Sequence, residues 1–368
     1  MNSTIRLGRI AGIEIGVNWT WLAVFALIVW SLAARVFPDA VPGRADSTYY
    51  AMAIVAAILF FSSLLLHELG HAVEARREGM QIDGITLWLF GGVAKFRGMF
   101  PSAGAEFRIA IAGPLVSLLL GAAFIGLAIA WSGSEEVDTV LEWLGQINIL
   151  LLVFNLLPAL PLDGGRVLRS ALWAFRGDFV FATRVAATIG RAFGALFVAS
   201  GLALAFLADE SQTNGIWIAL LGWFLYTAAS SEAQTGVVHA RLAGLRVGDL
   251  MVRQPASVRP DQTIGELMEG MIWTDRHEAY PVVEGDRAVG LLPFRAIADV
   301  PRREWDVRTV RDSMVPLSDL PVLGEDEPLD QALARLGDGS GQALVVDGDR
   351  VTGLLTATDV GRALQRRS

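Results

Sequence analysis

Cysteine is missing from this chain of 368 residues, and histidine is scarce. Without cysteine, disulfide bonds and thiolate-ligated zinc sites are excluded, so a bound zinc ion would need His, Asp or Glu ligands. The four histidines are His67, His71, His239 and His277. The first two stand four residues apart, whereas we expect His239 and His277 to be ordinary surface residues.

Charge is also scarce. Charged residues make up 18% of the chain, against about 25% in a typical soluble domain. Lys95 is the only lysine, and the formal net charge of −8 argues against a nucleic-acid partner. Hydrophobic residues reach 53% and the mean hydropathy is +0.46. The apolar runs are concentrated before about residue 230, which predicts a membrane part followed by a soluble part.

Six apolar runs approach the length that crosses a bilayer as a helix. They cover residues 19–34, 49–72, 107–131, 140–157, 192–207 and 215–229. Arg6 and Arg9 precede the first run as in a signal peptide, but the mixed stretch 8–16 separates them from it, which favours a membrane span. We therefore expect a polytopic α-helical membrane domain with six transmembrane helices.

Basic residues gather on one side of this expected bundle. They follow the second and fourth runs, as Arg76, Arg77, Lys95, Arg97, Arg166, Arg169, Arg176 and Arg184. The turns 132–136 and 209–211 contain none. By the positive-inside rule, we expect a multi-pass protein of the cell membrane, in contact with lipid, with both termini in the cytoplasm.

The second run ends in the motif His67-Glu68-Leu69-Gly70-His71. Histidines at i and i+4 share one face of a helix and can bind one metal ion, and the glutamate between them can act as a general base toward water. Titratable groups at membrane depth are costly and usually functional. Because His67 precedes Arg76 by roughly 13 Å of helix, we expect the site below the cytoplasmic surface but within the membrane.

A catalytic zinc site usually has three protein ligands, and Asp163 is the best candidate for the third. It lies in the segment Asn155-Leu-Leu-Pro-Ala-Leu-Pro-Leu-Asp-Gly-Gly-Arg166, where prolines stop the helix and glycines permit a sharp turn. The expected topology places Asp163 on the same side of the membrane as both motif histidines. Taken alone, Asp-Gly-Gly could be a simple turn and Asn155 a contact between helices.

These segments together resemble the site-2 protease family, the zinc metalloproteases (peptidase M50) of regulated intramembrane proteolysis. The matching pieces are the histidine motif, Phe90-Gly91-Gly92, Ala112-Gly113-Pro114 and residues 155–166. The opening stretch 7–19 also resembles the strand pair that precedes the first helix in one branch of the family. The resemblance covers roughly residues 5 to 230.

The resemblance implies one Zn²⁺ per chain, held by His67, His71 and Asp163. It also implies that Glu68 activates the attacking water and that Asn155 holds the substrate carbonyl or oxyanion. Substrates would be transmembrane segments of other membrane proteins, with membrane-tethered transcription regulators as an expected class.

The stretch 85–96, between the second and third runs, has the content of a short hairpin at the membrane surface. Its strands would be separated by Gly91 and Gly92. An exposed edge there could pair with an unwound substrate, which makes the two glycines candidate substrate-binding residues. A purely structural hairpin covering the site is the equal alternative.

The second half of the chain is a repeat. Residues 247–251 match 310–314, and residues 282–292 match 345–355, both at an offset of 63 (310 − 247 and 345 − 282). A constant offset at both ends makes chance matching improbable. Each repeat is expected to form a helix, two strands joined by a Gly-Asp turn, and a final helix.

This repeat resembles a tandem pair of CBS domains, cytoplasmic α/β modules that commonly sense adenine nucleotides. The ribose-contact pattern of that family fits the second repeat, which places Thr356 and Asp359 as candidate nucleotide-binding residues, whereas the first repeat has Pro293 and Ala296 instead. A structural or dimerising role is the alternative, and the resemblance implies a homodimer. We expect domains at 1–230, 246–306 and 307–368, with a linker at 231–245 and a hinge within it at 232–245.

The favoured hypothesis is therefore an intramembrane zinc endopeptidase with a regulatory or dimerising CBS pair. A CBS-regulated membrane transporter is one alternative, but few polar residues outside the motifs could line a path through the helices. A zinc-binding pseudoprotease that acts as a scaffold is the other, and the intact Glu68 argues against it.

Overall fold

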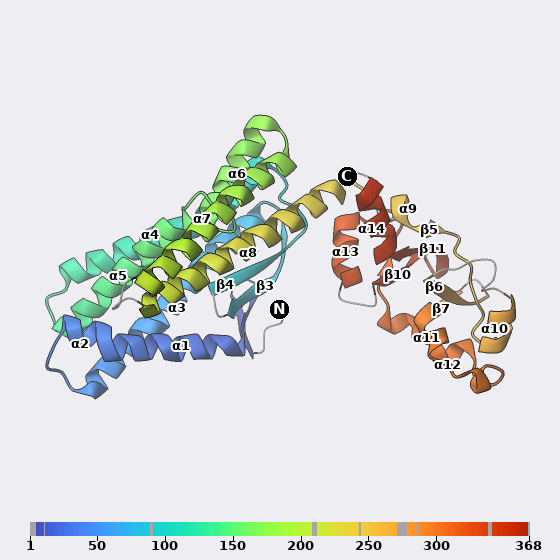
Figure 1. Cartoon of the computed structure of the whole chain (residues 1–368), viewed down its shortest axis with the longest axis horizontal. Helices are drawn as coiled ribbons and strands as arrows, with labels where there is room; N and C mark the ends of the chain where they lie inside the picture. The colour runs from blue at the N-terminus through green and yellow to red at the C-terminus, as the bar shows by residue number, and fades with distance from the viewer. Residues whose placement is uncertain are drawn as a thin grey trace. The chain divides into compact units, whose positions relative to one another are not determined.

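The computed structural model describes residues 5–10, 12–88, 91–207, 212–242, 244–270, 278–285, 287–337 and 341–366. His277 lies outside the described residues, as does the side chain of His239. The chain divides into two compact units, Met1–Val237 and Val238–Ser368 (Figure 1). The first is dominated by long helices, and the second mixes short helices with a sheet.

The helices of the first unit begin and end where the sequence supplies caps and charges. They are α1 (Trp19–Ser31), η1 (Leu32–Val36), α2 (Phe37–Ala40), α3 (Asp46–Arg77), α4 (Ala103–Ala130), α5 (Glu135–Asn155), α6 (Asp163–Arg176), α7 (Phe179–Leu207) and α8 (Gln212–Leu242). Asn18 Oδ1 accepts from the Thr20 amide at 3.1 Å to cap α1, and Ser102 Oγ caps α4 by accepting from the Ala105 amide at 3.1 Å. Arg76 and Arg77 close the last turn of α3, where cations stabilise the helix dipole.

Five helical stretches in the described residues are long and apolar enough to cross a membrane. They are Trp19–Ala40, Asp46–Arg77, Ala103–Ala130, Glu135–Asn155 and Phe179–Leu207. These agree with a multi-pass membrane protein and coincide with the first five expected spans. The sixth expected span, 215–229, lies within the helix α8, but Asn214, Ser230 and Ser231 flank a short apolar run. Its crossing of the membrane stays a prediction.

A four-stranded sheet packs against the helix that carries the histidine motif. Its strands are β1 (Ile5–Ile10), β2 (Ile13–Val17), β3 (Gln81–Trp88) and β4 (Gly91–Arg97), in the order β1-β2-β3-β4. The β2–β3 pair is parallel and the other two pairs are antiparallel. Ile13 and Ile85 are buried with Ala72 of α3. The expected opening strand pair and the hairpin after α3 are therefore both present, and they form one sheet. The expectation that Gly91 and Gly92 separate the hairpin strands is wrong, because both glycines belong to β4 and pair with Trp88 and Leu87.

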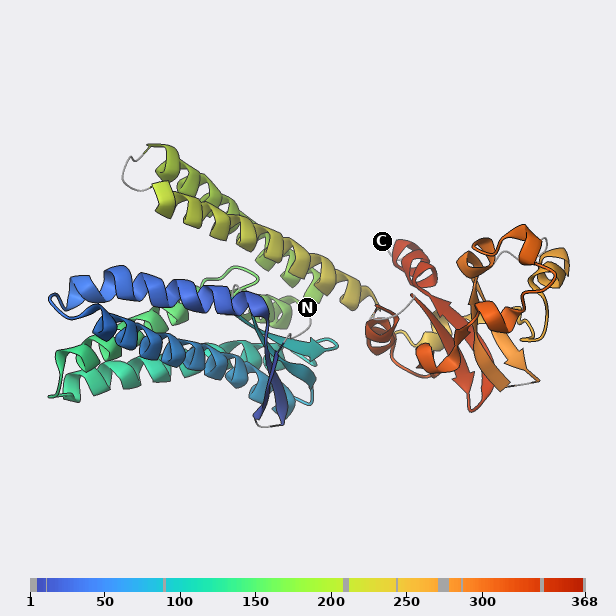
Figure 2. The same ribbon diagram turned by 90° about the horizontal axis from the view of Figure 1, so that it is seen from below.

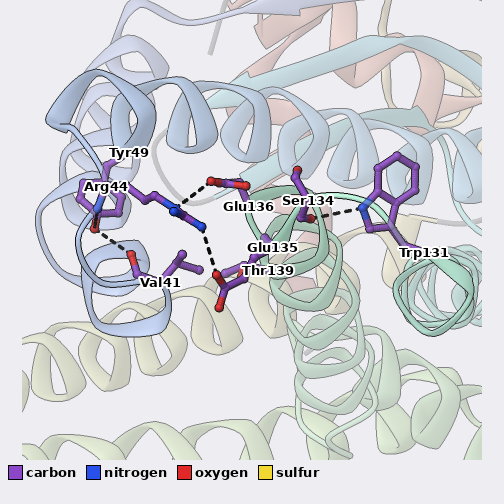
Figure 3. Close-up of polar contacts among 8 residues, drawn as sticks. All are labelled: Val41, Arg44, Tyr49, Trp131, Ser134, Glu135, Glu136 and Thr139. Carbon is purple, nitrogen blue, oxygen red and sulfur yellow. Dashed lines mark hydrogen bonds and ion pairs between the residues drawn. The ribbon is translucent and has the colours of Figure 1, made fainter.

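Two connections at the other end of the bundle are tied together by polar contacts (Figure 3). Arg44, between α2 and α3, pairs with Glu135 at 3.1 Å and with Glu136 at 2.8 Å at the start of α5. Tyr49 Oη donates to the Val41 carbonyl at 2.7 Å. These contacts fix α3 relative to α5 at the end of the bundle away from the sheet.

The last two helices of the unit, α7 and α8, run side by side as a pair, and Figure 2 shows them set apart from the layer of α1, α3, α4 and α5. Glycines allow the pair to approach closely. A Cβ on Gly201 would lie 2.4 Å from the Ala219 amide nitrogen, and a Cβ on Gly222 would lie 2.5 Å from that of Val198. Small residues of this kind commonly mediate helix contacts in membranes.

The second unit confirms the sequence repeat, and both repeats have the same register shift in their hairpins. Its sheet runs β6 (Ala279–Glu284), β7 (Arg287–Pro293), β11 (Arg350–Thr356), β10 (Gln342–Asp347) and β9 (Val322–Leu323), with β5 (Val252–Arg253) on β11 and β8 (Val315–Pro316) on β7. In the first hairpin Val282 pairs with Gly290 just before a register shift, and in the second Val345 pairs with Gly353 just before the same shift.

The two repeats exchange their opening helices. The shorter elements are α9 (Val247–Leu250), α10 (Ile264–Gly270), α11 (Phe294–Ala298), η2 (Arg302–Glu304), α12 (Val310–Ser313), η3 (Leu317–Asp319), α13 (Leu329–Gly337) and α14 (Ala357–Arg366). Val247 of the first repeat is buried with Leu329 and Val345 of the second, and Val310 of the second is buried in the core of the first. The repeats therefore form one folding unit.

The stretch expected as a linker is largely helical. α8 continues without interruption to Leu242, so residues 231–242 belong to that helix. Leu242 is itself buried with Val247 in the core of the second unit. The hinge expected at 232–245 and the domain boundaries stay predictions.

Candidate metal and protease site

Three donor atoms converge from two helices that are far apart in the sequence. His67 and His71 lie one turn apart on α3, and Asp163 opens α6. Asp163 Oδ2 is 3.2 Å from the Nε2 atom of each histidine, and the two Nε2 atoms are 3.2 Å apart. Among the described residues, these three form the group that could hold a metal ion.

Both histidines are oriented by a partner on their other ring nitrogen. His71 Nδ1 lies 2.6 Å from the Ile109 carbonyl oxygen, which can only accept, so Nδ1 donates and Nε2 keeps its lone pair. His67 Nδ1 lies 2.9 Å from Ser117 Oγ, which can take either role. Such partners on the far nitrogen are typical of metal-ligating histidines. Both come from α4, which is thus the supporting element of the site.

The donor set fits zinc. Two imidazole nitrogens and one carboxylate oxygen are ordinary zinc ligands, and tetrahedral bonds of about 2.0–2.1 Å place ligand atoms roughly 3.3 Å apart. The observed separations of 3.2 Å match that spacing. His67 and His71 are 2% and 7% exposed, so the donors are shielded from bulk water.

Gly113 leaves the space that these donors occupy. A Cβ on this residue would lie 2.2 Å from His71 Nε2 and 2.7 Å from His67 Nε2. Any side chain at position 113 would therefore fill the volume into which the donors point. This explains, in physical terms, the glycine of the Ala112-Gly113-Pro114 segment.

The first turn of α6, which begins with Asp163, packs closely against the segment before it. A Cβ on Gly164 would lie 2.2 Å from the Leu156 carbonyl oxygen, and one on Gly165 would lie 2.2 Å from the Leu160 amide nitrogen. The first turn of α6 therefore packs directly on the backbone of residues 156–160, so the chain reverses before Asp163, and the sharp turn expected at the two glycines is instead the start of a helix. This close approach requires glycine at both positions.

A cavity of about 360 Å³ opens onto the three donors. Glu68, Asn155 and Arg166 line it with the donors, and so do Gly91 and Gly92 at the start of β4. Its apolar wall comes mainly from α5 and α8, as Leu151, Phe154, Leu221, Phe224, Leu225 and Ala228. The structure thus brings together every site residue expected in the first unit.

Glu68 faces the strand β4. A Cβ on Gly92 would lie 2.3 Å from Glu68 Cγ and 2.9 Å from Cδ, so the backbone at Gly92 packs directly on this side chain. A larger residue at 92 would displace the carboxyl group. Gly92 therefore has a positioning role toward Glu68 in addition to lining the cavity.

α6 is held in place by a buried ion pair. Arg169 Nε donates to Glu106 Oε1 at 2.6 Å, and the side chains are 2% and 0% exposed. Arg169 Nη1 also lies 3.4 Å from Glu232 Oε1 of α8. Because Asp163 opens the same helix, this pair helps to fix the third metal donor.

Replacing Arg169 by methionine is expected to destabilise the fold strongly, by about 3–5 kcal/mol, because it leaves the buried Glu106 carboxylate without its main partner. The measurement is the free energy of unfolding of the purified protein in denaturing detergent. Arg176→Met, at an exposed position on the same helix, is the control and should change it by less than about 1.5 kcal/mol, because it loses only an exposed contact with the Phe181 ring and a favourable place in the last turn of α6. Equal stabilities for the two variants would contradict the role assigned to the pair.

Comparison with known proteins agrees with this geometry. A model of peptidase family M50 matches residues 55–135 and 129–198. The chain is 40% identical over 371 residues to the Mycobacterium tuberculosis protein named "Putative zinc metalloprotease Rip3", a match that covers 99% of this chain and 93% of that one. It is 31% identical over 364 residues to zinc metalloprotease MJ0392 of Methanocaldococcus jannaschii, covering 99% and 97%. The chain belongs to peptidase family M50, the site-2 proteases.

Two further comparisons cover the first and the second part of the chain separately. A solved site-2 protease from Methanocaldococcus jannaschii is 31% identical, with a TM-score of 0.45, over 62% of this chain and 94% of that one. A model of the CBS domain matches residues 247–302 and 310–366. By the two family models, the chain combines a peptidase family M50 part, which has five helices apolar enough to cross a membrane, with a tandem CBS pair.

The CBS residues expected to contact a nucleotide form a helix cap. Asp359 Oδ2 accepts from the Thr356 amide at 3.0 Å and from Thr356 Oγ1 at 2.7 Å, at the start of α14. Thr309 and Asp312 form the same contacts at the start of α12, at 3.0 and 2.7 Å. Thr356 and Asp359 therefore have a structural task that does not depend on a ligand, and their role in binding stays a prediction.

Sequence reasoning did not identify the parts of the M50 site that come from tertiary packing. Ser117 and the Ile109 carbonyl on α4 orient the histidines, and α8 supplies much of the cavity wall. Gly113 carried a motif signal, but its contact with the donors depends on how α4 crosses α3. Arg166 also belongs to a motif segment, but its place in the cavity wall depends on how α6 packs.

Proposed function

We propose that this chain is an intramembrane zinc endopeptidase that hydrolyses transmembrane segments of other proteins. The observation that supports this best is the meeting of His67, His71, Asp163 and Glu68 in one cavity. Two of the donors and Glu68 lie on α3, a helix apolar enough to cross a membrane. Family membership agrees with this activity.

In the proposed reaction, His67, His71 and Asp163 would hold the zinc ion. When bound, zinc supplies Lewis-acid chemistry, which polarises a carbonyl group and makes water a better nucleophile. Glu68 takes a proton from the attacking water and later delivers a proton to the leaving amine. Asn155, which lines the same cavity, would donate from its amide to the oxygen of the scissile carbonyl.

Substrate entry is proposed along β4. This strand is at the edge of the sheet order β1-β2-β3-β4, and it begins with Gly91 and Gly92 in the cavity wall. An extended peptide could pair with that edge by main-chain hydrogen bonds. Because a helix hides its carbonyl groups in its own hydrogen bonds, unwinding against such an edge would present a scissile bond to Glu68.

The arrangement in the membrane follows from charge. We propose that both termini are cytoplasmic, with the site near the cytoplasmic end of α3, where Arg76 and Arg77 follow it. Arg44 would lie on the opposite side of the membrane, where its charge is offset by Glu135 and Glu136. Membrane-tethered transcription regulators are the proposed substrate class.

Removing zinc is expected to abolish peptide cleavage, and adding zinc back is expected to restore it. The measurement is cleavage of a model transmembrane peptide by purified protein before chelation, after chelation, and after stoichiometric zinc is returned. Activity should track zinc content. Full cleavage by protein that contains no measurable zinc would contradict the proposed activity.

The CBS pair is proposed as a regulatory and dimerising module that binds an adenine nucleotide through the second repeat. Titration of the 238–368 fragment with AMP and ATP is expected to release or absorb heat, and Asp359→Ala is expected to reduce that heat. Asp312→Ala removes a cap of the same design, worth about 1 kcal/mol, and should leave the heat unchanged. Absence of heat from the unsubstituted fragment would contradict nucleotide binding.

A further inference from the structure

Arg166 lines the cavity but has no role in the proposed reaction. It lies three residues after Asp163 on α6, which places both side chains on neighbouring positions of one helix face. It lines the same cavity as Glu68 and Asn155. A cation at this depth needs either a structural partner or a function.

The contrast with Arg169, one turn further along α6, is informative. Arg169 is 2% exposed, and its guanidinium is engaged by Glu106 and Glu232. Arg166 is 23% exposed, and its Nη2 lies 3.7 Å from Glu232 Oε1, which is an ion pair but too long for a hydrogen bond. Its Nε is buried and has no hydrogen-bond partner among the described residues. The terminal nitrogens are not among the buried atoms, so they are the donors that Arg166 can offer to a ligand in the cavity.

An unwound substrate needs hydrogen-bond donors. A transmembrane segment that is unwound for cleavage exposes main-chain carbonyl oxygens that have lost their helical partners, and leaving them unpaired away from water is costly. The wall from α5 and α8 is mostly apolar and offers them little. An arginine carries five N–H donors in a planar fork. Among the residues that line the cavity, Arg166 therefore has the largest number of side-chain hydrogen-bond donors.

We propose that Arg166 is a substrate-binding residue, whose guanidinium donates hydrogen bonds to main-chain carbonyl oxygens of the unwound segment next to the scissile bond. This proposal rests on the proposed endopeptidase function. Glu232 acts as the positioning residue, because its ion pair with Arg166 holds the guanidinium between α6 and α8 at the cavity wall. Phe100, with its ring centre 6.0 Å from the guanidinium carbon, supports it from another side.

The test compares kcat and KM for a model transmembrane peptide with a central helix-breaking sequence, using the full-length zinc-loaded protein. Arg166→Met is expected to raise KM about ten- to hundredfold, the range for losing hydrogen bonds to a charged group. kcat should change by less than about threefold, because carbonyls beside the scissile bond are bound equally before and during reaction. Arg176→Met makes the same chemical change outside the cavity and should leave KM unchanged.

Two further measurements separate a binding role from a structural one. Zinc content and unfolding free energy show whether Arg166→Met is folded. If it is not, Arg166→Lys is used, because it keeps the charge beside Glu232 but loses the forked donors. Arg166→Lys should then raise KM above that of the unsubstituted protein, because lysine cannot reproduce the forked donors. An unchanged KM in a folded variant, or a fall in kcat with KM unchanged, would overturn the proposal.

The failure of the proposed function would be seen separately. If the unsubstituted protein cleaves no peptide, the endopeptidase assignment fails, and the dissociation constant of the same peptide then decides the role of Arg166. It is measured for Glu68→Gln and for Glu68→Gln combined with Arg166→Met. Weaker binding by the double variant supports the proposal, and equal binding overturns it.

Discussion

Replacing Glu68 by glutamine is expected to abolish peptide cleavage while zinc stays bound. Glutamine matches the shape of glutamate against Gly92 but cannot accept a proton from water. Loss of a general base typically lowers kcat by about 10²–10⁴-fold. The three metal donors are untouched, so metal analysis should still give one zinc per chain. The measurement is kcat for a model transmembrane peptide beside the zinc content of the same sample.

The control for this substitution is Glu74→Gln, on the same helix beyond the cavity. Glu74 is half-buried and pairs with the exposed Arg77 at 3.2 Å near the end of α3. Its substitution should leave kcat within about twofold, because Glu74 does not line the cavity and an ion pair with an exposed arginine contributes little to the fold. Cleavage by Glu68→Gln at the unsubstituted rate would show that the mechanism is wrong. If neither the unsubstituted protein nor the variant cleaves the peptide while both bind zinc, the result would favour a zinc-binding scaffold.

Replacing Asp163 by alanine is expected to remove most of the zinc, and cleavage with it. The change deletes one of three donors and leaves a gap beside two imidazoles. Mutating residues that merely support ligands lowers metal affinity by about 10–100-fold, so loss of a ligand should exceed about 100-fold. The measurement is zinc affinity by competition with a chelator, which reports on the donors independently of cleavage.

Asp178→Ala is the matched control for that variant. Asp178 Oδ1 accepts from the Phe181 amide at 2.9 Å at the start of α7, so its loss should cost about 1 kcal/mol of cap energy and no zinc affinity. Equal zinc affinity for Asp163→Ala and Asp178→Ala would mean that Asp163 is a turn residue and not a ligand.

The central site was predictable because its parts obey short-range rules or lie at one end of a membrane bundle. The spacing of His67 and His71 follows from helical geometry alone. Asp163 could be assigned to the same site because the basic residues predict that both segments lie on one side of the membrane. The third ligand then had to be sought only among polar residues on that side. The observed Oδ2–Nε2 separations of 3.2 Å confirm that the three side chains meet.

The contacts that could not be predicted depend on how helices and strands pack against one another in three dimensions. Ser117 and the Ile109 carbonyl reach the histidines only because α4 packs along α3, and neither has a sequence pattern that marks it. In the second unit, the offset of the repeat predicted the hairpins but not the exchange of Val247 and Val310 between cores. The helical continuation of α8 to Leu242 was also missed, because the change in composition at 231–245 resembles that of a linker.

The most direct test of the central claim is a comparison of membrane-protein fragments in host cells that carry either the unsubstituted protein or Glu68→Ala. If the chain is an intramembrane protease, a trimmed single-pass protein should accumulate only in cells with the variant, and that protein is the substrate. Identical fragment profiles, together with no cleavage of a model transmembrane peptide by the purified zinc-loaded protein, would contradict the account.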